Sequence, residues 1–178
     1  MMTKLLLLFA LVSASMTAAE RVGVLLKTDA GDIEIEVMLG AAPISAGSFL
    51  AHVDAGLLDG GGFYRTVYPE NDNGSPKISV IQGGILPDTE GLPAVAHETT
   101  EQTSMLHLDG VISLARGEVG SGSGGTFFIC IGDQPSLDMG GGRAVSGDGQ
   151  GFAAFGRVVK GMEVVKKIHQ SKTNSAND

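Results

Sequence analysis

Short segments in which apolar and polar residues alternate constrain the fold of this chain more than any other feature. The segment GDIEIEV at 31–37 places Ile33, Ile35 and Val37 on one side and three acidic side chains on the other. This alternation is typical of a β-strand with one solvated face. Glycine-rich stretches that suit turns better than helices separate further segments of strand character. These segments are 22–27, 63–68, 78–83, 110–116, 126–132 and 152–159.

Two segments have helical character instead. Pro43 opens the segment 43–56, in which apolar residues recur close to a helical period. The second segment is 161–170. Seven or eight short strands with two helices predict a mainly β fold, a barrel or sandwich whose ends are closed by helices.

The length and composition favour one domain. A chain of 178 residues with 43% hydrophobic side chains can fill one core, whereas a second domain would be cramped. We expect this domain to span residues 20–170, with a polar tail without periodicity at 171–178.

The N-terminus has the composition of an export signal. Lys4 supplies a positive charge, an eight-residue apolar run follows at 5–12, and small residues suitable for cleavage stand at 17–19. This pattern predicts a signal peptide over residues 1–19. An uncleaved membrane anchor is the alternative, but a helical span needs roughly 20 apolar residues. We therefore expect an exported protein, periplasmic or secreted after cleavage, with no stable membrane anchor.

The charge of the mature chain argues against nucleic acid as a partner. Without Lys4, the 12 basic residues of the full chain become 11 against 20 acidic residues, a net charge of −9. The acids are dispersed, which is typical of a solvated surface and not of a binding tail.

Cys130 is the only cysteine and stands in the apolar run FFICI. This context predicts a buried strand residue without a disulfide or catalytic role. We expect a monomer.

Several motifs suggest chemistry that their context does not support. The glycine-rich segment 117–126 lacks the GK[ST] ending of a phosphate-binding loop and continues into a strand. The four histidines have no metal-ligand spacing, and segment 138–151 lacks the ordered acids of a calcium loop, so we expect no metal and no cofactor. Serine, histidine and aspartate occur without a GxSxG context, which leaves a hydrolytic triad unsupported but open.

An arginine in the strand segment GGFYRTVY at 61–68 needs an explanation. Alternation places Phe63, Arg65 and Val67 on one face of this strand. The aliphatic part of the Arg65 side chain can pack on apolar neighbours while the guanidinium reaches water, or Arg65 can belong to a functional site.

The order of six motifs resembles the cyclophilin-type peptidyl-prolyl cis-trans isomerases. From Val22 to Ile168 they are AAPISAGSFL at 41–50, FYR at 63–65, QGG at 82–84, ISLA at 112–115, FFI at 127–129 and FAAFGRVVKGMEVV at 152–165. The resemblance implies a closed eight-stranded antiparallel β-barrel capped by two α-helices, with a proline-containing peptide bound in an outer groove. It implies an enzyme that accelerates X-Pro rotation in exported polypeptides and assists their folding. A non-catalytic proline-peptide-binding chaperone or scaffold module is the alternative.

The resemblance also implies roles for individual residues. Arg65 matches the catalytic arginine, and Gln82 would contact the peptide carbonyl or steady that arginine. Phe128 would form the floor of the proline pocket, and Ala115 would receive the backbone of the preceding substrate residue. Ordinary core is the alternative for Phe128, whereas Phe127 is assigned to the core because neighbouring strand residues face opposite ways.

Several positions depart from the better-known cyclophilins. Val80 occupies the position of a methionine in those proteins, Thr126 that of a glutamine, and Arg116 that of an asparagine. Leu137 corresponds roughly to a tryptophan and Phe152 to a histidine, so we expect a partly rebuilt proline site with modest catalysis. The segment YPENDNGSPK at 68–77 has turn residues at nearly every position. Two interpretations stay open: the segment borders the groove and takes part in choosing substrates, or it is a neutral surface insertion.

Overall fold

The computed structural model describes residues 20–86, 88–143 and 148–171. The strands are β1 (Val22–Thr28), β2 (Gly31–Val37), β3 (Gly62–Val67), β4 (Val80–Gly84), β5 (Val111–Leu114), β6 (Thr126–Cys130) and β7 (Ala153–Lys160). The helices are α1 (Pro43–Asp54), α2 (Thr100–Thr103) and α3 (Met162–His169), with a 3-10 turn η1 (Pro135–Leu137). The seven predicted strands and two predicted helices are confirmed, whereas α2 and η1 were not predicted. The predicted signal peptide and all but the first residue of the predicted tail lie outside the described residues.

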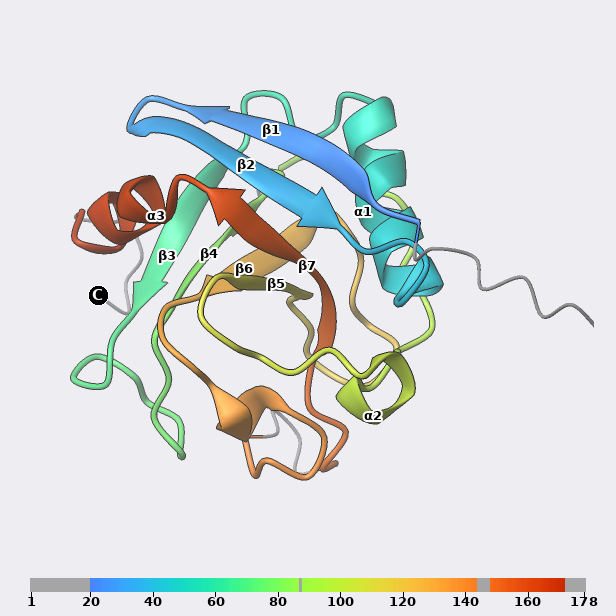
Figure 1. Ribbon diagram of the computed structural model, residues 1–178, viewed down its shortest axis with the longest axis vertical. Coiled ribbons are helices and arrows are strands. Elements are labelled where there is room, and N and C mark those ends of the chain that lie inside the picture. Colours follow the sequence, from blue (N-terminus) through green and yellow to red (C-terminus); the bar gives the residue numbers. More distant parts are fainter. Residues whose placement is uncertain (1–19, 87, 144–147, 172–178) are drawn as a thin grey trace, which may run out of the picture.

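All seven strands described here form one antiparallel sheet in the order β1-β2-β7-β5-β6-β4-β3 (Figure 1). The predicted closed eight-stranded barrel is wrong, because this sheet is a half-barrel with β1 and β3 at its edges. The local pattern predicted seven or eight strands, and the closed eight-stranded arrangement was implied by the resemblance. Between β4 and β5 the chain instead forms a long connection that carries α2.

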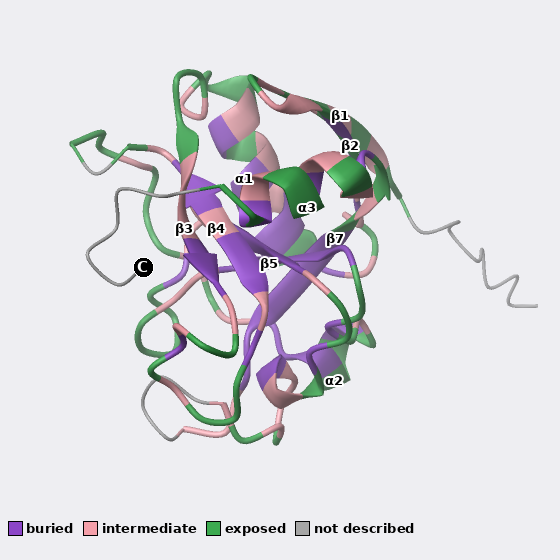
Figure 2. Ribbon diagram, turned by 90° about the vertical axis from the view of Figure 1, so that its left-hand side faces the viewer, coloured by how far each residue is buried: buried purple, intermediate pink, exposed green. Residues whose placement is uncertain are grey.

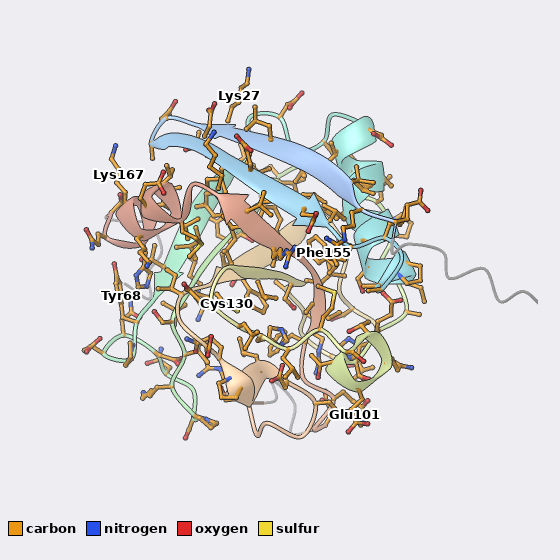
Figure 3. All side chains as sticks on the ribbon, viewed as in Figure 1. Lys27, Tyr68, Glu101, Cys130, Phe155 and Lys167 are labelled. Atoms are coloured by element: carbon orange, nitrogen blue, oxygen red, sulfur yellow. The ribbon has the colours of Figure 1, made fainter. Side chains whose placement is uncertain are left out.

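Two helices cover the openings of the curved sheet. Helix α3 packs against β2, β3 and β4 and buries Val165, while α1 packs against β7 and buries Phe49 (Figure 1). Lys27 and Lys167 project outward, whereas Phe155 is buried in the core on the inner face of the sheet (Figure 3). No helix within the described ranges is long and apolar enough to cross a membrane.

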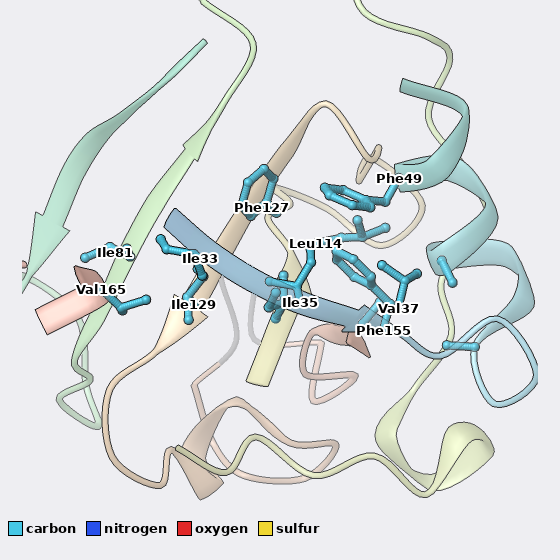
Figure 4. Close-up of a cluster of buried hydrophobic side chains, with 14 residues drawn as sticks. Ile33, Ile35, Val37, Phe49, Ile81, Leu114, Phe127, Ile129, Phe155 and Val165 are labelled. Carbon is cyan, nitrogen blue, oxygen red and sulfur yellow. The ribbon is translucent and has the colours of Figure 1, made fainter. Parts of the chain in front are cut away.

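The inner face of the sheet carries the main core (Figure 4). Phe49 of α1 meets Phe127 of β6 edge to face, with ring centroids 5.4 Å apart, and it lies 5.1 Å from the ring of Phe155. Such aromatic contacts add specificity of geometry to the burial of apolar area. The core thus joins α1 to the strands that carry the motifs.

A second apolar cluster lies on the opposite face of the same sheet. Its members are Val67, Ile78, Val80, Phe128, Cys130, Leu137 and Phe152. Strands β4 and β5 are therefore buried along most of their length (Figure 2). Cys130 is fully buried, as predicted, and burial raises the pKa of its thiol.

The glycine-rich segment forms a loop over residues 117–125 and continues into β6 at Thr126, and its glycines serve packing. The backbone N–H of Gly124 donates to the Ser48 hydroxyl at 2.9 Å. A Cβ atom on Gly124 would lie 2.3 Å from the backbone nitrogen and Cα of Phe49. Only glycine therefore lets this loop lie directly against α1.

The β3–β4 connection, residues 68–79, is held by one buried carboxylate. Asp72 accepts hydrogen bonds from the backbone N–H groups of Gly74 and Ile78 and from both terminal nitrogens of Arg143. Burial by itself raises the pKa of Asp72, but these donors outweigh burial and lower the pKa to about 2. The loop is thereby tied to a segment 71 residues away in the chain.

Replacing Gly124 tests the close packing of the loop on α1. We expect Gly124→Ala to lower the free energy of unfolding by about 1–3 kcal/mol, because the added methyl group must displace backbone atoms. Urea unfolding followed by circular dichroism measures the change. Gly23→Ala is the matched control, since a Cβ there meets nothing within 4 Å and the stability should hardly change. Equal stability of the two variants would contradict the packing argument.

The Asp72 carboxylate predicts an acid-sensitive contribution to stability. Its pKa is about 2 when folded and about 4 when unfolded, so its contribution is complete above about pH 4 and is lost as pH falls through 2. Between about pH 5 and pH 2, the wild-type free energy of unfolding should fall by about 2 kcal/mol more than that of Asp72→Asn.

Urea titrations at a series of pH values measure this difference. Asp59→Asn removes an exposed carboxylate and should behave like the wild type. An Asp72→Asn variant with unchanged acid sensitivity would show that another group is responsible.

Candidate active site

A β-bulge in β3 sets the direction of the candidate catalytic arginine. Arg65 lies opposite Gln82 and Phe63 opposite Gly83, so β3 carries one extra residue between them. Because Gln82 and Gly83 are consecutive and face opposite sides of the sheet, Phe63 and Arg65 do so too. The predicted shared face of Phe63, Arg65 and Val67 is therefore wrong for Phe63, which packs on the inner core.

A pocket of about 610 Å³ opens on the outer face of the sheet. Strand register brings its parts together, because Gln82 of β4 lies between Arg65 of β3 and Phe128 of β6. All eight residues predicted for the site line this pocket: Arg65, Val80, Gln82, Ala115, Thr126, Phe128, Leu137 and Phe152. Their proximity is now established, while the role of each stays a prediction.

The Arg65 guanidinium is directed by one amide. Its Nη1 donates to Gln82 Oε1 at 3.1 Å, and no carboxylate pairs with Arg65 in the described part of the chain. An arginine carries five N–H donors, so the remaining donors can serve a ligand in the pocket. The charge of Arg65 is thus held in the pocket without being neutralised.

The apolar floor is formed by aromatic rings in contact. Phe128 meets Phe152 edge to face with centroids 5.5 Å apart. On another side Phe128 stacks on His107, with centroids 6.0 Å apart and an angle of 17° between the rings. Phe127 packs in the inner core, so the predicted division between the two neighbouring phenylalanines is confirmed.

A buried hydrogen-bond chain supports this floor. His107 Nδ1 lies 2.7 Å from Asp138 Oδ1, and its Nε2 lies 3.1 Å from the Ser113 hydroxyl. The order of groups is that of a hydrolytic triad, but Ser113 is fully buried and no substrate carbonyl can reach it. These hydrogen bonds with Asp138 and Ser113 instead hold the His107 ring against Phe128. His107 was missed because one histidine in a loop carries no local pattern.

Arg116 closes another side of the pocket. Its Nη1 and Nη2 donate to the two oxygens of Asp148 at 2.8 and 3.0 Å, and its Nε donates to the carbonyl of Gly151 at 2.8 Å. The guanidinium carbon lies 5.2 Å from the centre of the Phe152 ring, a cation–π contact. Arg116 thus covers and orients Phe152 and carries a neutralised charge.

Further lining residues come from loops that the sequence analysis did not assign to the site. They are Gly74, Ser75, Ile78, Gly117, Ser121, Ser123 and Arg143. The β3–β4 connection therefore borders the pocket, while its part in choosing substrates stays a prediction. Within the described ranges, no cluster of three or more histidine, cysteine, aspartate or glutamate side chains could hold a metal ion.

The comparison with known proteins agrees with this geometry. A model of the family described as cyclophilin type peptidyl-prolyl cis-trans isomerase/CLD matches residues 23–178. The chain is similar to peptidyl-prolyl cis-trans isomerase A of Dickeya dadantii (strain 3937), with 33% identity over 166 residues, 92% of this chain and 79% of that protein. It is also 30% identical to a peptidyl-prolyl cis-trans isomerase of Acinetobacter baylyi over 151 residues, 84% of this chain and 73% of the relative.

The fold has solved counterparts as well. The crystal structure of a cyclophilin type peptidyl-prolyl cis-trans isomerase of Cryptosporidium parvum superposes with a TM-score of 0.69 at 18% identity, covering 89% of this chain and 90% of that one. A likeness at this identity supports the fold, while the family match and the Dickeya relative carry the assignment. The chain belongs to the cyclophilin-type peptidyl-prolyl cis-trans isomerase family and is an enzyme of that type.

Proposed function

We propose that this isomerase uses the Arg65 pocket to accelerate rotation about X-Pro bonds of exported polypeptides, and so assists their folding. The family implies proline-containing peptides as substrates. One observation carries the assignment of the site. Arg65 is the lining arginine without a carboxylate partner in the described chain, and it shares the pocket with the apolar floor at Phe128.

The chemistry of X-Pro rotation needs a donor of this kind. The bond must abandon amide resonance over a barrier of ~18–20 kcal/mol, and no covalent bond of the substrate breaks. As the amide twists, its nitrogen regains a lone pair that the planar ground state lacks. A hydrogen bond from Arg65 to this nitrogen therefore stabilises the transition state more than the substrate. Gln82 restricts the guanidinium to the pocket and lowers the cost of ordering it.

The magnitudes require the floor as well as the arginine. Bringing a ten-second isomerisation to about a millisecond requires roughly 10⁴-fold, or ~5.5 kcal/mol. One charge-assisted hydrogen bond contributes only ~1.5–3 kcal/mol. The remainder is assigned to the apolar floor, which holds the proline ring and keeps water from the amide.

The strand register suggests the direction in which the peptide runs. The backbone N–H of Ala115 donates to the carbonyl of Thr126 at one end of β6, while Cys130 lies opposite Val80 at the other. If Ala115 receives the residue before proline and Phe128 holds the ring, the residue after proline extends toward the end of β6 at Cys130. The β3–β4 connection begins and ends at this end of the sheet.

The proposal of export is based on the composition of residues 1–19. A single positive charge, an eight-residue apolar run and small residues before Glu20 support cleavage by a signal peptidase. Substrates would then be polypeptides that fold after export.

Replacing Arg65 tests the catalytic proposal. We expect Arg65→Ala to lower kcat/KM by roughly 10- to 100-fold, the equivalent of one charge-assisted hydrogen bond. Arg65→Lys should recover only part of this loss, because an ammonium lacks the planar set of donors. Exchange between cis and trans peptide, measured by NMR, gives the rates without a coupled protease.

Arg157→Ala is the matched control, because Arg157 is exposed and pairs with Glu36 on the strands away from the pocket. It should retain wild-type rates. Equal rates for the wild type and Arg65→Ala would remove Arg65 from the mechanism. Binding of peptide to the wild type without accelerated exchange would favour the non-catalytic module.

The signal peptide is tested by expressing the full chain in a Gram-negative host. The form recovered outside the cytoplasm should begin at Glu20 when its mass is measured. Placing arginines at Leu7 and Leu8 interrupts the apolar run and should leave the uncleaved chain inside the cell. Recovery of the full-length chain in the membrane fraction would support an anchor instead.

A further inference from the structure

The groove has a wall that the sequence motifs do not contain. Gly74, Ser75 and Ile78 of the β3–β4 connection line the pocket together with Arg143. The connection starts after Val67 and ends before Val80, so the wall stands at the end of the sheet opposite Ala115. In the direction derived above, it faces the part of the substrate that follows proline.

Arg143 is fixed in this wall by several contacts. Its Nη1 donates to Asp72 Oδ2 at 2.5 Å and to the carbonyl of Pro76 at 2.6 Å, and its Nη2 donates to Asp72 Oδ1 at 2.7 Å. A Cβ atom on Gly74 would lie 2.6 Å from the guanidinium carbon, so the guanidinium lies close against that glycine. Two of its five N–H groups, including Nε–H, have no partner within the described ranges.

The two ion pairs beside the pocket differ in which partner, the arginine or the aspartate, is exposed. The side chain of Asp72 has no exposed surface, whereas that of Arg143 is 15% exposed, so this pair presents its cation. In the other pair, Arg116 is only 2% exposed and Asp148 is 19% exposed, so little positive surface results. Positive charge therefore concentrates at Arg65 and at the Arg143 wall.

The described residues that line the pocket include three arginines and no carboxylate. The other charged side chains of the β3–β4 connection, Glu70 and Lys77, are exposed, oppositely charged and not part of the lining. The groove is thus locally cationic although the whole chain has a net charge of −8. Exposed charges farther than a Debye length, ~10 Å at 0.1 M salt, are largely screened from a negative group bound beside Arg143.

We propose that Arg143 is a specificity-determining residue, and that the groove favours peptides with aspartate or glutamate immediately after proline. This inference rests on the proposed function, which supplies the direction of the peptide. The unpaired N–H groups of Arg143 can donate to the substrate carboxylate, while the buried bond to Asp72 holds the guanidinium in place.

Peptides of matched sequence test the preference. In blocked hexapeptides Ala-Ala-Ala-Pro-Y-Ala, Y is Glu, Gln or Lys, and a mirror series carries Y before proline. NMR titration gives the affinity of the wild type, and exchange spectroscopy gives its acceleration of cis–trans exchange. The Glu peptide should bind about two- to fivefold tighter than the Gln peptide, the range of an exposed ion pair, and the Lys peptide should bind more weakly. Raising the salt from about 0.02 to 0.5 M should reduce the difference.

The mirror series distinguishes the effect of Arg143 on peptide affinity from the electrostatic effect of Arg65. The acid preference should be smaller when Y precedes proline, because the Arg116 pair at that end presents little positive surface. An equal preference in both series would overturn the assignment to Arg143. Equal affinity of the wild type for Glu and Gln peptides after proline would overturn the inference itself.

A double variant tests the residue. Asp72→Asn with Arg143→Gln removes both charges, so no unpaired carboxylate is left buried. It should bind Glu and Gln peptides equally, whereas the control Arg157→Gln should keep the wild-type ratio. Persistence of the ratio in the double variant would contradict the proposal. If the double variant does not fold, the wild-type peptide series and the salt dependence still decide.

The outcome for the proposed function is separate. Binding without accelerated exchange for any peptide would contradict catalysis, while the three affinities would still test the acid preference. Accelerated exchange without an acid preference would leave the isomerase proposal intact and remove only the role of Arg143.

Discussion

The structure depends on the two-residue alternation of β6, a strand that is buried on both faces. Phe127 points into the core, where it meets the ring of Phe49 on α1. Its neighbour Phe128 points to the opposite side and forms the floor of the pocket. Because consecutive residues of one strand face opposite ways, the core and the pocket share a single backbone. The position of the pocket floor is thereby as well defined as the packing of the core.

The bulge in β3 has a comparable effect on the charge of the pocket. Without an extra residue, Phe63 and Arg65 would share one face, and either an arginine would enter the core or a phenylalanine would leave it. The bulge places each on the side that suits its chemistry. Burying an unpaired guanidinium in the core would cost several kcal/mol. In the pocket, Gln82 and solvent share that cost.

The three arginines of the pocket differ in how their charges are compensated. Arg116 is held by Asp148 and packs on a ring, and Arg143 is held by Asp72 and forms a wall. Only Arg65 is left with an amide as its partner in the described chain. Arg116, whose guanidinium is covered, shapes the cavity, and Arg143 presents its cation beside a fully buried carboxylate. Arg65, which has no carboxylate partner in the described chain, retains its full electrostatic effect on a ligand. This division explains how one pocket can contain several guanidinium groups and one candidate catalytic centre.

The sequence alone determined the seven strands, the two longer helices and the eight residues that meet in the pocket. The strands and helices follow from local periodicity, and the site residues follow from motifs that resemble the family. Only the tertiary structure decided that the sheet is open, that β3 has a bulge, and that His107, Ile78 and Arg143 belong around the pocket. The physical reason is distance along the chain. The bonds from Arg143 to Asp72 and from His107 to Asp138 join residues 71 and 31 positions apart. Such pairs leave no periodic trace, because either partner by itself looks like an ordinary residue of a polar loop.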